Sequence, residues 1–336
     1  MKSLPQATES LVDRFGRHVT YVRLSVTDRC DLRCRYCMSE DMEFLPRARI
    51  LTLEEFARLG KIFASLGVKK IRVTGGEPLA RSNVVQLFRE LGALEAVKDL
   101  TITTNGTRLA RYAEPLKSAG VTRVNISLDT LHPDRFTRLA RVDALNRVLA
   151  GIDAARAAGF RRIKLNSVIL GGHNDDEVAE LARFALDGGM DISFIEEMPL
   201  GRVDDHDRAL TYISSDQVVE ILASDFRLTP STASTGGPTR YFEVSGYQNR
   251  IGVISPHSHN FCDTCNRVRV TAEGRLLLCL GQEHSVDLRR VLRAYPADDE
   301  PVQQAIVAAM DIKPKGHEFD LGVQPVIQRH MNVTGG

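Results

Sequence analysis

This sequence has no substantial excess of positive or negative charge, and it contains no long hydrophobic run. The chain carries 44 Lys and Arg residues against 43 Asp and Glu residues, a formal net charge of +1. Sequence-independent binding of nucleic acid needs an excess of cations, so we expect no nucleic-acid partner. Residues 1–18 contain no apolar run of the roughly 7 to 15 residues that a secretory signal requires. No later stretch approaches the roughly 18 apolar residues of a membrane span, so we expect a soluble, cytoplasmic protein without a membrane partner.

Cysteine is scarce, but its placement is not random. The 336 residues include six cysteines, which fall into two groups of three. The first triplet has the spacing C-x-x-x-C-x-x-C and comprises Cys30, Cys34 and Cys37; the second comprises Cys262, Cys265 and Cys279. In a reducing compartment such cysteines are metal ligands or reactive thiols more often than a disulfide framework.

Strands and helices are expected to alternate from about residue 20 to residue 200. Short β-branched runs alternate there with segments of helical period, which is typical of βα units and a mostly parallel sheet. The expected strands cover residues 20–26, 70–74, 99–104, 123–128, 162–170 and 191–196. A capping box at Thr52 and Glu55 begins one helix, and further helices are expected at 81–93, 108–119, 143–158 and 174–187. These units predict an α/β fold, an incomplete (β/α)6 TIM-like barrel with its chemistry at the carboxyl ends of the strands.

The pattern changes after about residue 200. One helix is expected near 214–223, and the Ser/Thr/Gly/Pro-rich stretch 229–239 is predicted to be a mobile loop. The segments YFEVSG, RIGVISP, RVRVTAEG and RLLLCL predict antiparallel strands with a turn at Glu273 and Gly274. We therefore expect two domains, a partial barrel over residues 1–200 and a smaller C-terminal β-containing extension over residues 201–336.

The first triplet follows the first expected strand, where a barrel of this type places its active site. Three thiolates close in sequence can hold three corners of a cubane cluster and leave the fourth iron open. A structural zinc site ordinarily needs four ligands, and no His lies near the first triplet. For the second triplet the spacing leaves zinc open, because His257 or His259 could complete a Cys3His site.

Short motifs accompany both triplets. Tyr36 precedes the last cysteine of the first triplet, and Gly-Gly-Glu-Pro at 75–78 follows the second expected strand. Further motifs are LSVTDRC (24–30), TTNG (103–106), NISLD (125–129), FCDTCNRVR (261–269), LLLCL (276–280) and the terminal Gly335 and Gly336. Together these motifs resemble the radical S-adenosylmethionine (SAM) superfamily and, within it, the GTP 3',8-cyclase family of molybdenum cofactor biosynthesis. The resemblance implies a lyase that cyclises GTP to 3',8-cyclo-7,8-dihydro-GTP.

The resemblance also implies cofactors and contacts. It implies two 4Fe–4S clusters, held by the two triplets, and SAM bound through Tyr36, Gly76, Ser127 and Met198. It implies GTP contacts from Arg23, Lys70, Arg72, Thr103, Lys164, Arg267, Val268 and Arg269. It implies a tail, Gly335 and Gly336, that reaches the active site, and no side chain acting as a catalytic acid or base. A reductant, a downstream cyclic pyranopterin monophosphate synthase and a homodimer are expected as partners.

Several residues support this interpretation on physical grounds. Cations on the inner strands of a parallel sheet are costly unless they face a polar cavity, and four occur there: Arg23, Lys70, Arg72 and Lys164. Arg267 and Arg269, two apart on an expected strand, point to one face. Gly75 and Gly76 fit a close approach of a ligand to the backbone at a strand end.

One position departs from the family pattern, and two other functions remain open. The family commonly has Arg where this chain has Ser193. We expect weaker binding of the triphosphate unless Arg202, Arg208 or another loop cation substitutes. A peptide-modifying radical SAM enzyme with an auxiliary cluster would share the first triplet but normally carries more C-terminal cysteines. A noncatalytic scaffold with zinc in both triplets is the alternative from a different class of protein.

Overall fold

A single twelve-stranded sheet runs through the computed structural model, which describes residues 10–201, 207–320 and 327–335. Its strand order is β12-β11-β10-β1-β2-β3-β4-β5-β6-β9-β8-β7. The centre consists of the six expected parallel strands: β1 (Tyr21–Ser25), β2 (Lys70–Thr74), β3 (Asp99–Thr104), β4 (Arg123–Ser127), β5 (Arg162–Ile169) and β6 (Asp191–Glu196). Their predicted bounds are correct to within one residue. Because β12 and β7 end the order unpaired with each other in the described part of the chain, the barrel is incomplete, as expected.

Two C-terminal strands extend the parallel sheet at both edges. β9 (Arg250–Ile254) pairs in parallel with β6, and β10 (Arg267–Val270) pairs in parallel with β1. The expected antiparallel pairing occurs on their outer sides. At one edge β8 (Arg240–Val244) pairs with β9, and β7 (Leu228–Ser231) pairs with β8. At the other edge β11 (Arg275–Leu277) pairs with β10, and β12 (Ser285–Asp287) pairs with β11. The sequence did not reveal the parallel edges, because an alternating pattern does not specify the partner of an edge strand. The loop prediction is wrong over residues 229–231, which lie in β7.

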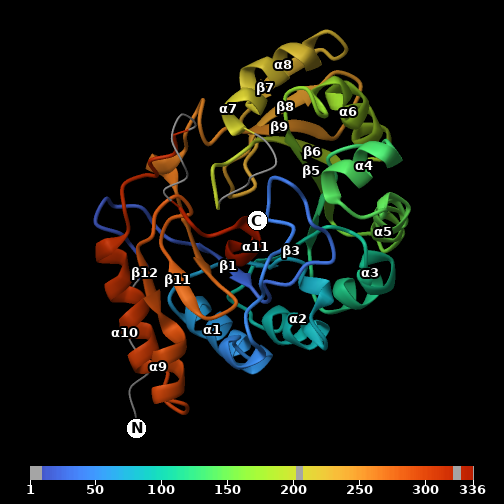
Figure 1. The fold of residues 1–336 in the computed structure, drawn as a ribbon. Coiled ribbons are helices and arrows are strands. Elements are labelled where there is room, and N and C mark those ends of the chain that lie inside the picture. The colour runs from blue at the N-terminus through green and yellow to red at the C-terminus, as the bar shows by residue number, and fades with distance from the viewer. Residues whose placement is uncertain (1–9, 202–206, 321–326, 336) are drawn as a thin grey trace.

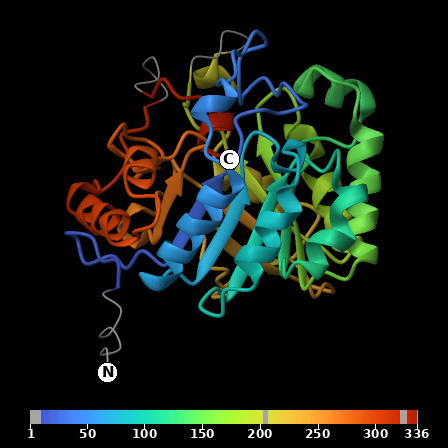
Figure 2. The ribbon, with the colours of Figure 1, turned by 90° about the horizontal axis from the view of Figure 1, so that it is seen from below.

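Helices cover the outer face of the parallel strands (Figures 1 and 2). They are α1 (Leu53–Ser65), α2 (Val84–Gly92), α3 (Leu109–Ser118), α4 (Pro133–Ala140), α5 (Leu145–Ala157) and α6 (Val178–Asp187). The C-terminal part contributes α7 (Arg208–Thr211), α8 (Ser215–Ala223), α9 (Leu288–Ala294), α10 (Glu300–Ala309) and α11 (Met331–Thr334). Single-turn 3-10 helices are η1 (Arg47–Arg49), η2 (Pro78–Ala80), η3 (Asp175–Glu177), η4 (Cys262–Thr264) and η5 (Met310–Ile312). Within the described ranges, no helix has the length and apolar content that crossing a membrane requires.

The expected capping box forms at the start of α1. The Thr52 hydroxyl accepts a hydrogen bond from the Glu55 amide at 3.1 Å, and the Thr52 amide donates to the Glu55 carboxylate at 2.7 Å. These bonds satisfy amides that lack partners within the helix.

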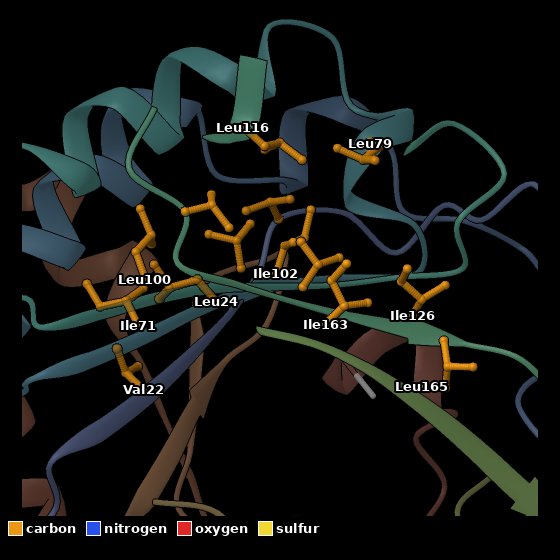
Figure 3. Packing of buried hydrophobic residues seen from close by; sticks show 14 of the residues in the cluster. Val22, Leu24, Ile71, Leu79, Leu100, Ile102, Leu116, Ile126, Ile163 and Leu165 are labelled. Carbon is orange, nitrogen blue, oxygen red and sulfur yellow. The ribbon is translucent and has the colours of Figure 1, made fainter. Parts of the chain in front are cut away.

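The alternation of side chains along the strands separates the hydrophobic core from the site. Val22 and Leu24 of β1 pack with Ile71 and Ile102 beneath the helices (Figure 3). Tyr21 and Arg23 alternate with them on β1 and therefore face the interior of the barrel. The short helix α11 lies inside the arc of strands, so the C-terminal segment returns to the centre of the molecule (Figure 1).

Candidate active site

Two adjacent cavities occupy the interior of the barrel. The first is lined by the first cysteine triplet and the second by the second triplet. Four residues, Asn166, Ile195, Met198 and Met331, line both cavities. The two triplets therefore face neighbouring parts of one interior. The first triplet lies at the carboxyl ends of the parallel strands, where the sequence predicted the chemistry, whereas the second lies at their amino ends, because Cys262 and Cys265 precede β10 and Cys279 follows the antiparallel β11.

The Gly-Gly motif holds the loop that carries the first triplet. The Gly76 amide donates to the Thr27 carbonyl at 2.8 Å, and the Glu77 amide donates to the Arg29 carbonyl at 2.8 Å. A Cβ on Gly76 would lie 2.5 Å from the Arg29 carbonyl oxygen, a distance that real Cβ atoms do not show. The close approach that demands glycine here is made by the protein backbone and not, as the sequence suggests, by a ligand. Gly76 still lines the first cavity.

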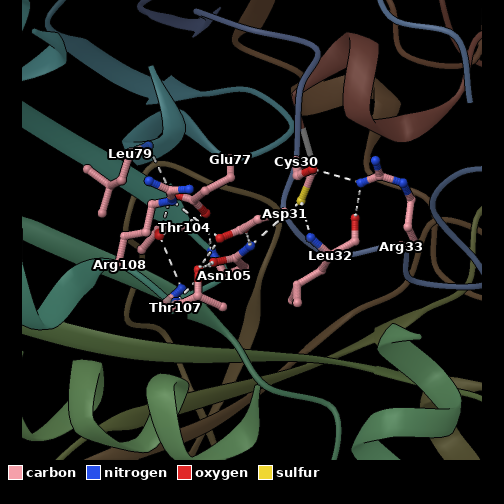
Figure 4. Close-up of polar contacts among 11 residues, drawn as sticks. Cys30, Asp31, Leu32, Arg33, Glu77, Leu79, Thr104, Asn105, Thr107 and Arg108 are labelled. Atoms are coloured by element: carbon pink, nitrogen blue, oxygen red, sulfur yellow. Dashed lines mark hydrogen bonds and ion pairs between the residues drawn. The ribbon is translucent and has the colours of Figure 1, made fainter. Parts of the chain in front are cut away.

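A buried polar network fixes the same loop from β3 (Figure 4). The Glu77 carboxylate accepts hydrogen bonds from the Thr104 hydroxyl at 2.8 Å and the Asn105 amide at 2.7 Å. The Asn105 side chain donates to Asp31 at 2.7 Å and lies 3.6 Å from the Cys30 sulfur. Burial raises the pKa of Glu77 to about 7. The TTNG motif thus positions the first cysteine, a role that the sequence did not reveal.

All four residues that the resemblance implies for SAM line the first cavity. Tyr36, Gly76, Ser127 and Met198 come from the cysteine loop, the end of β2, the end of β4 and the segment after β6. The Tyr36 hydroxyl donates to Asp129 at 2.8 Å, and burial raises the pKa of Asp129 to about 6. Asp129 was not among the predicted site residues, although it ends the NISLD motif.

The second cavity is strongly cationic. Its described lining contains no carboxylate and five cationic side chains: Arg23, Arg72, Lys164, Arg267 and Arg269. Within the described part of the chain, the buried Nε atoms of Arg267 and Arg269 have no hydrogen-bond partner. Unpaired buried donors of this kind are costly and indicate an anionic ligand.

Three of the predicted GTP contacts lie elsewhere. Thr103 lines the first cavity, and its buried hydroxyl has no partner among the described residues. Lys70 lines neither cavity, because its ammonium donates to the Thr235 carbonyl at 2.6 Å and pairs with Asp99 at 3.2 Å. The Val268 side chain packs in the core, on the face of β10 opposite to its two arginine neighbours.

Tyr21 belongs to this cavity but was missed. Its hydroxyl accepts a hydrogen bond from Arg23 Nε at 3.0 Å. The Lys70 ammonium lies 4.9 Å from the centre of its ring, and the Arg72 guanidinium carbon lies 5.6 Å from it. Burial alone would raise the pKa of Tyr21, but neighbouring cations outweigh it and lower this pKa to about 7. The period-two spacing of Tyr21 and Arg23 is the signal that could have found it.

Ser193 is buried beside Lys164. The Lys164 ammonium donates to Ser193 Oγ at 3.1 Å and to Thr239 Oγ1 at 3.3 Å, and burial holds the pKa of Lys164 well below its usual range. Arg208 does not substitute for the family's arginine, because it pairs with Glu197 at 3.0 Å and donates to two backbone carbonyls. Arg202 lies outside the described residues.

The histidines that could have completed a zinc site are engaged elsewhere. His257 Nε2 lies 3.0 Å from the Glu197 carbonyl, and His259 Nε2 lies 2.9 Å from the Asp216 carboxylate. Within the described ranges, neither triplet brings its three sulfurs within 4.8 Å of one another. One tetrahedral zinc ion would hold them at about 3.8 Å. All six thiols are free of disulfides, so the donor chemistry and the spacing fit iron–sulfur clusters better than single zinc ions.

The C-terminal segment closes the interior. The Met331 amide donates to the Cys37 carbonyl at 3.2 Å, and the Asn332 side chain donates to the Asp28 carbonyl at 2.9 Å. Gly335 packs so tightly that a Cβ there would lie 2.4 Å from Thr74 Cγ2. Gly336, the other predicted tail residue, lies outside the described residues.

Known proteins share both the fold and the sequence. Residues 24–185 match the Radical SAM superfamily, and residues 190–319 match Molybdenum Cofactor Synthesis C. The GTP 3',8-cyclase of Saccharophagus degradans is 61% identical over 97% of this chain and 99% of its own. The GTP 3',8-cyclase of Marinobacter nauticus is 57% identical over 97% and 98%, and that of Pseudomonas entomophila is 56% identical over 100% of both chains.

The fold is also shared by a protein of much lower sequence identity. Streptococcus suis SuiB, solved bound to S-adenosylmethionine, superposes with a TM-score of 0.61 at 16% identity, over 88% of this chain and 69% of that chain. At this identity the likeness shows the fold alone, whereas the relatives above share most of the sequence over nearly their whole length. The chain therefore belongs to the GTP 3',8-cyclase family of radical SAM enzymes.

Proposed function

We propose that this enzyme binds GTP in the second cavity and cyclises it to 3',8-cyclo-7,8-dihydro-GTP, the first step of molybdenum cofactor biosynthesis. The observation that carries the proposal is the cationic second cavity, which has no carboxylate in its described lining and adjoins the first cavity. A nucleoside triphosphate carries about four negative charges, so a chain with a net charge of +1 must gather its cations at one place to bind it.

In the first cavity, Cys30, Cys34 and Cys37 would hold one 4Fe–4S cluster. Tyr36, Gly76, Ser127 and Met198 would position SAM beside it, because all four line this cavity. When bound there, these cofactors would supply the radical chemistry by which the 3' hydrogen of the ribose is removed. The apolar side chains shared by the two cavities, such as Ile195 and Met198, exclude water and other quenchers from the path between them.

In the second cavity, Cys262, Cys265 and Cys279 would hold the other 4Fe–4S cluster, and three protein ligands rather than four would leave a position open for the guanine base. Its cations orient the triphosphate, and Thr103 contacts the nucleotide from the lining of the first cavity. Lys70 lies outside this lining, where its ammonium holds Asp99 and the Thr235 carbonyl in place. Val268 contributes only through its backbone. The proposed GTP contacts are therefore Arg23, Arg72, Thr103, Lys164, Arg267, Val268 and Arg269.

The proposal extends to the compartment and the partners of the enzyme. Six free thiols suit a reducing compartment, so we place the protein in the cytoplasm. A reductant supplies the electrons, a cyclic pyranopterin monophosphate synthase takes the product, and the protein forms a homodimer. We divide the chain into two domains near residue 200. The first cluster then belongs to the N-terminal domain and the second cluster to the C-terminal domain.

GTP labelled with deuterium at the ribose 3' position tests the proposal. Anaerobic turnover with SAM and dithionite should yield 5'-deoxyadenosine that carries one deuterium, measured by mass spectrometry. GTP labelled at the 2' position is the control and should transfer none. Deoxyadenosine without deuterium from either substrate would contradict the proposed reaction.

A further inference from the structure

A buried lysine lies against the second triplet, and none of the roles above uses it. Lys313 follows η5, and its side chain is only 1% exposed. Its ammonium donates to the Leu278 carbonyl at 3.1 Å and to Cys265 Sγ at 3.7 Å. A buried ammonium is costly unless negative charge compensates it. One carbonyl supplies part of that compensation, and a thiolate that ligates a cluster would supply the rest.

The segment that carries Lys313 packs closely over the triplet. The His317 backbone amide donates to the sulfur of Cys262. A Cβ on Gly316 would lie 3.3 Å from that same sulfur. Residues 313–317 therefore touch two of the three sulfurs, Cys262 through the backbone and Cys265 through the ammonium.

An arginine from the N-terminal region fixes this segment to the cysteine loop. Arg17 donates to the Cys262 carbonyl at 2.7 Å, to the Lys315 carbonyl at 2.6 Å and to the Pro314 carbonyl at 2.6 Å. Asp13 accepts from Arg17 Nε at 2.6 Å and holds the guanidinium in place. The position of the Lys313 ammonium is thus determined by the fold, and the side chain does not swing freely.

We propose that Lys313 sets the reduction potential of the second cluster, because its fixed positive charge stabilises the extra electron of the reduced cluster. The proposal rests on the assignment of the second triplet made above and adds a residue to that site. A positive charge beside a buried redox centre favours its more negative state, and cluster potentials respond to local charge and to hydrogen bonds at the sulfurs.

The test uses the full-length chain with Cys30, Cys34 and Cys37 replaced by alanine, so that the second cluster is the only one. One-electron reduction by dithionite is followed by electron paramagnetic resonance as the potential is lowered. Lys313→Met keeps the length of the side chain without its charge, and Lys313→Gln keeps a donor for the Leu278 carbonyl. Lys315→Met removes the charge of an exposed lysine two residues away and is the matched control.

We expect both Lys313 variants to lower the potential and the control to leave it unchanged. At the wild-type midpoint, the ratio of reduced to oxidised cluster should fall at least about tenfold, which corresponds to 59 mV for one electron. An unchanged potential in a variant that retains its iron would overturn the proposal. So would restoration of the wild-type potential by Gln, because the hydrogen bond rather than the charge would then be responsible.

Loss of iron is also informative. If both neutral variants lose the cluster, the Lys313→Arg variant, which keeps the positive charge, provides the test. Recovery of iron in this variant supports a requirement for the charge, and no recovery overturns the proposal. If the background protein holds no cluster before Lys313 is changed, the assignment of the second triplet is wrong, and the failure belongs to the proposed function.

Discussion

Arg269 provides a test in which stability and binding should change in opposite directions. Its side chain is 7% exposed, and its Nε has no partner among the described residues. Burial, with two neighbouring arginines, holds the pKa of Arg269 well below its usual range. A buried donor without a partner costs about 1–3 kcal/mol. Arg269→Met keeps an unbranched, flexible side chain without the charge, so it should stabilise the protein in the absence of nucleotide.

The size of the stabilisation can be measured as a thermal shift. One kcal/mol moves the unfolding midpoint by roughly 2–4 °C in chains of 150–250 residues, so we expect a rise of a few degrees. GTP binding should weaken at the same time, because a charge-assisted contact contributes about 1.5–3 kcal/mol, or roughly 10- to 150-fold in the dissociation constant.

Anaerobic melting curves with and without GTP, together with titration calorimetry, measure both effects. Arg290→Met is the matched control, because Arg290 is exposed on α9 and does not line the second cavity. It should change neither the midpoint nor the affinity. A lower midpoint for Arg269→Met with unchanged GTP affinity would refute the reasoning.

Three further predictions concern the cysteines, the Gly-Gly motif and the pH dependence of binding. Cys262→Ala should lose about half of the bound iron while the first cluster remains. An iron assay combined with electron paramagnetic resonance measures this, and a full iron content would contradict the prediction. Gly76→Ala should lose the first cluster and keep the second, because the new Cβ would lie 2.5 Å from the Arg29 carbonyl oxygen; normal iron content and SAM binding would count against it. GTP affinity should fall as pH rises from about 7 to 9, because Tyr21 becomes a phenolate above its pKa of about 7 and Lys70 loses its charge above its pKa of about 8. Calorimetry should show that Tyr21→Phe removes the lower part of this fall, and a flat profile in the unmodified enzyme would disprove the assignment.

The central strands could be predicted from the sequence because each is a short β-branched run followed by a helical segment. β2, β3 and β6 have the bounds that the pattern predicted. The parallel pairing of β9 and β10 with the barrel could not be predicted, since residue alternation specifies a face and not a partner. The helix α4 was missed because it follows β4 within the same connection as α5, where one helix was expected.

In the candidate site, too, some residues could be predicted from the sequence and others could not. The cysteine triplets and the Arg267 and Arg269 pair follow from spacing, and the structure brings each group to a cavity. Asp129 and Lys313 act through contacts with residues distant in sequence, which no local pattern reveals. The role of Gly76 was misassigned because sequence shows that a close approach occurs but does not show which atoms approach.

Conversion of the substrate tests the account most directly. Reconstituted protein incubated anaerobically with SAM, dithionite and GTP should form 5'-deoxyadenosine together with a cyclised nucleotide, both followed by mass spectrometry, and ATP in place of GTP should give no cyclised product. If both clusters are intact and neither deoxyadenosine nor a cyclised nucleotide forms, the account is wrong.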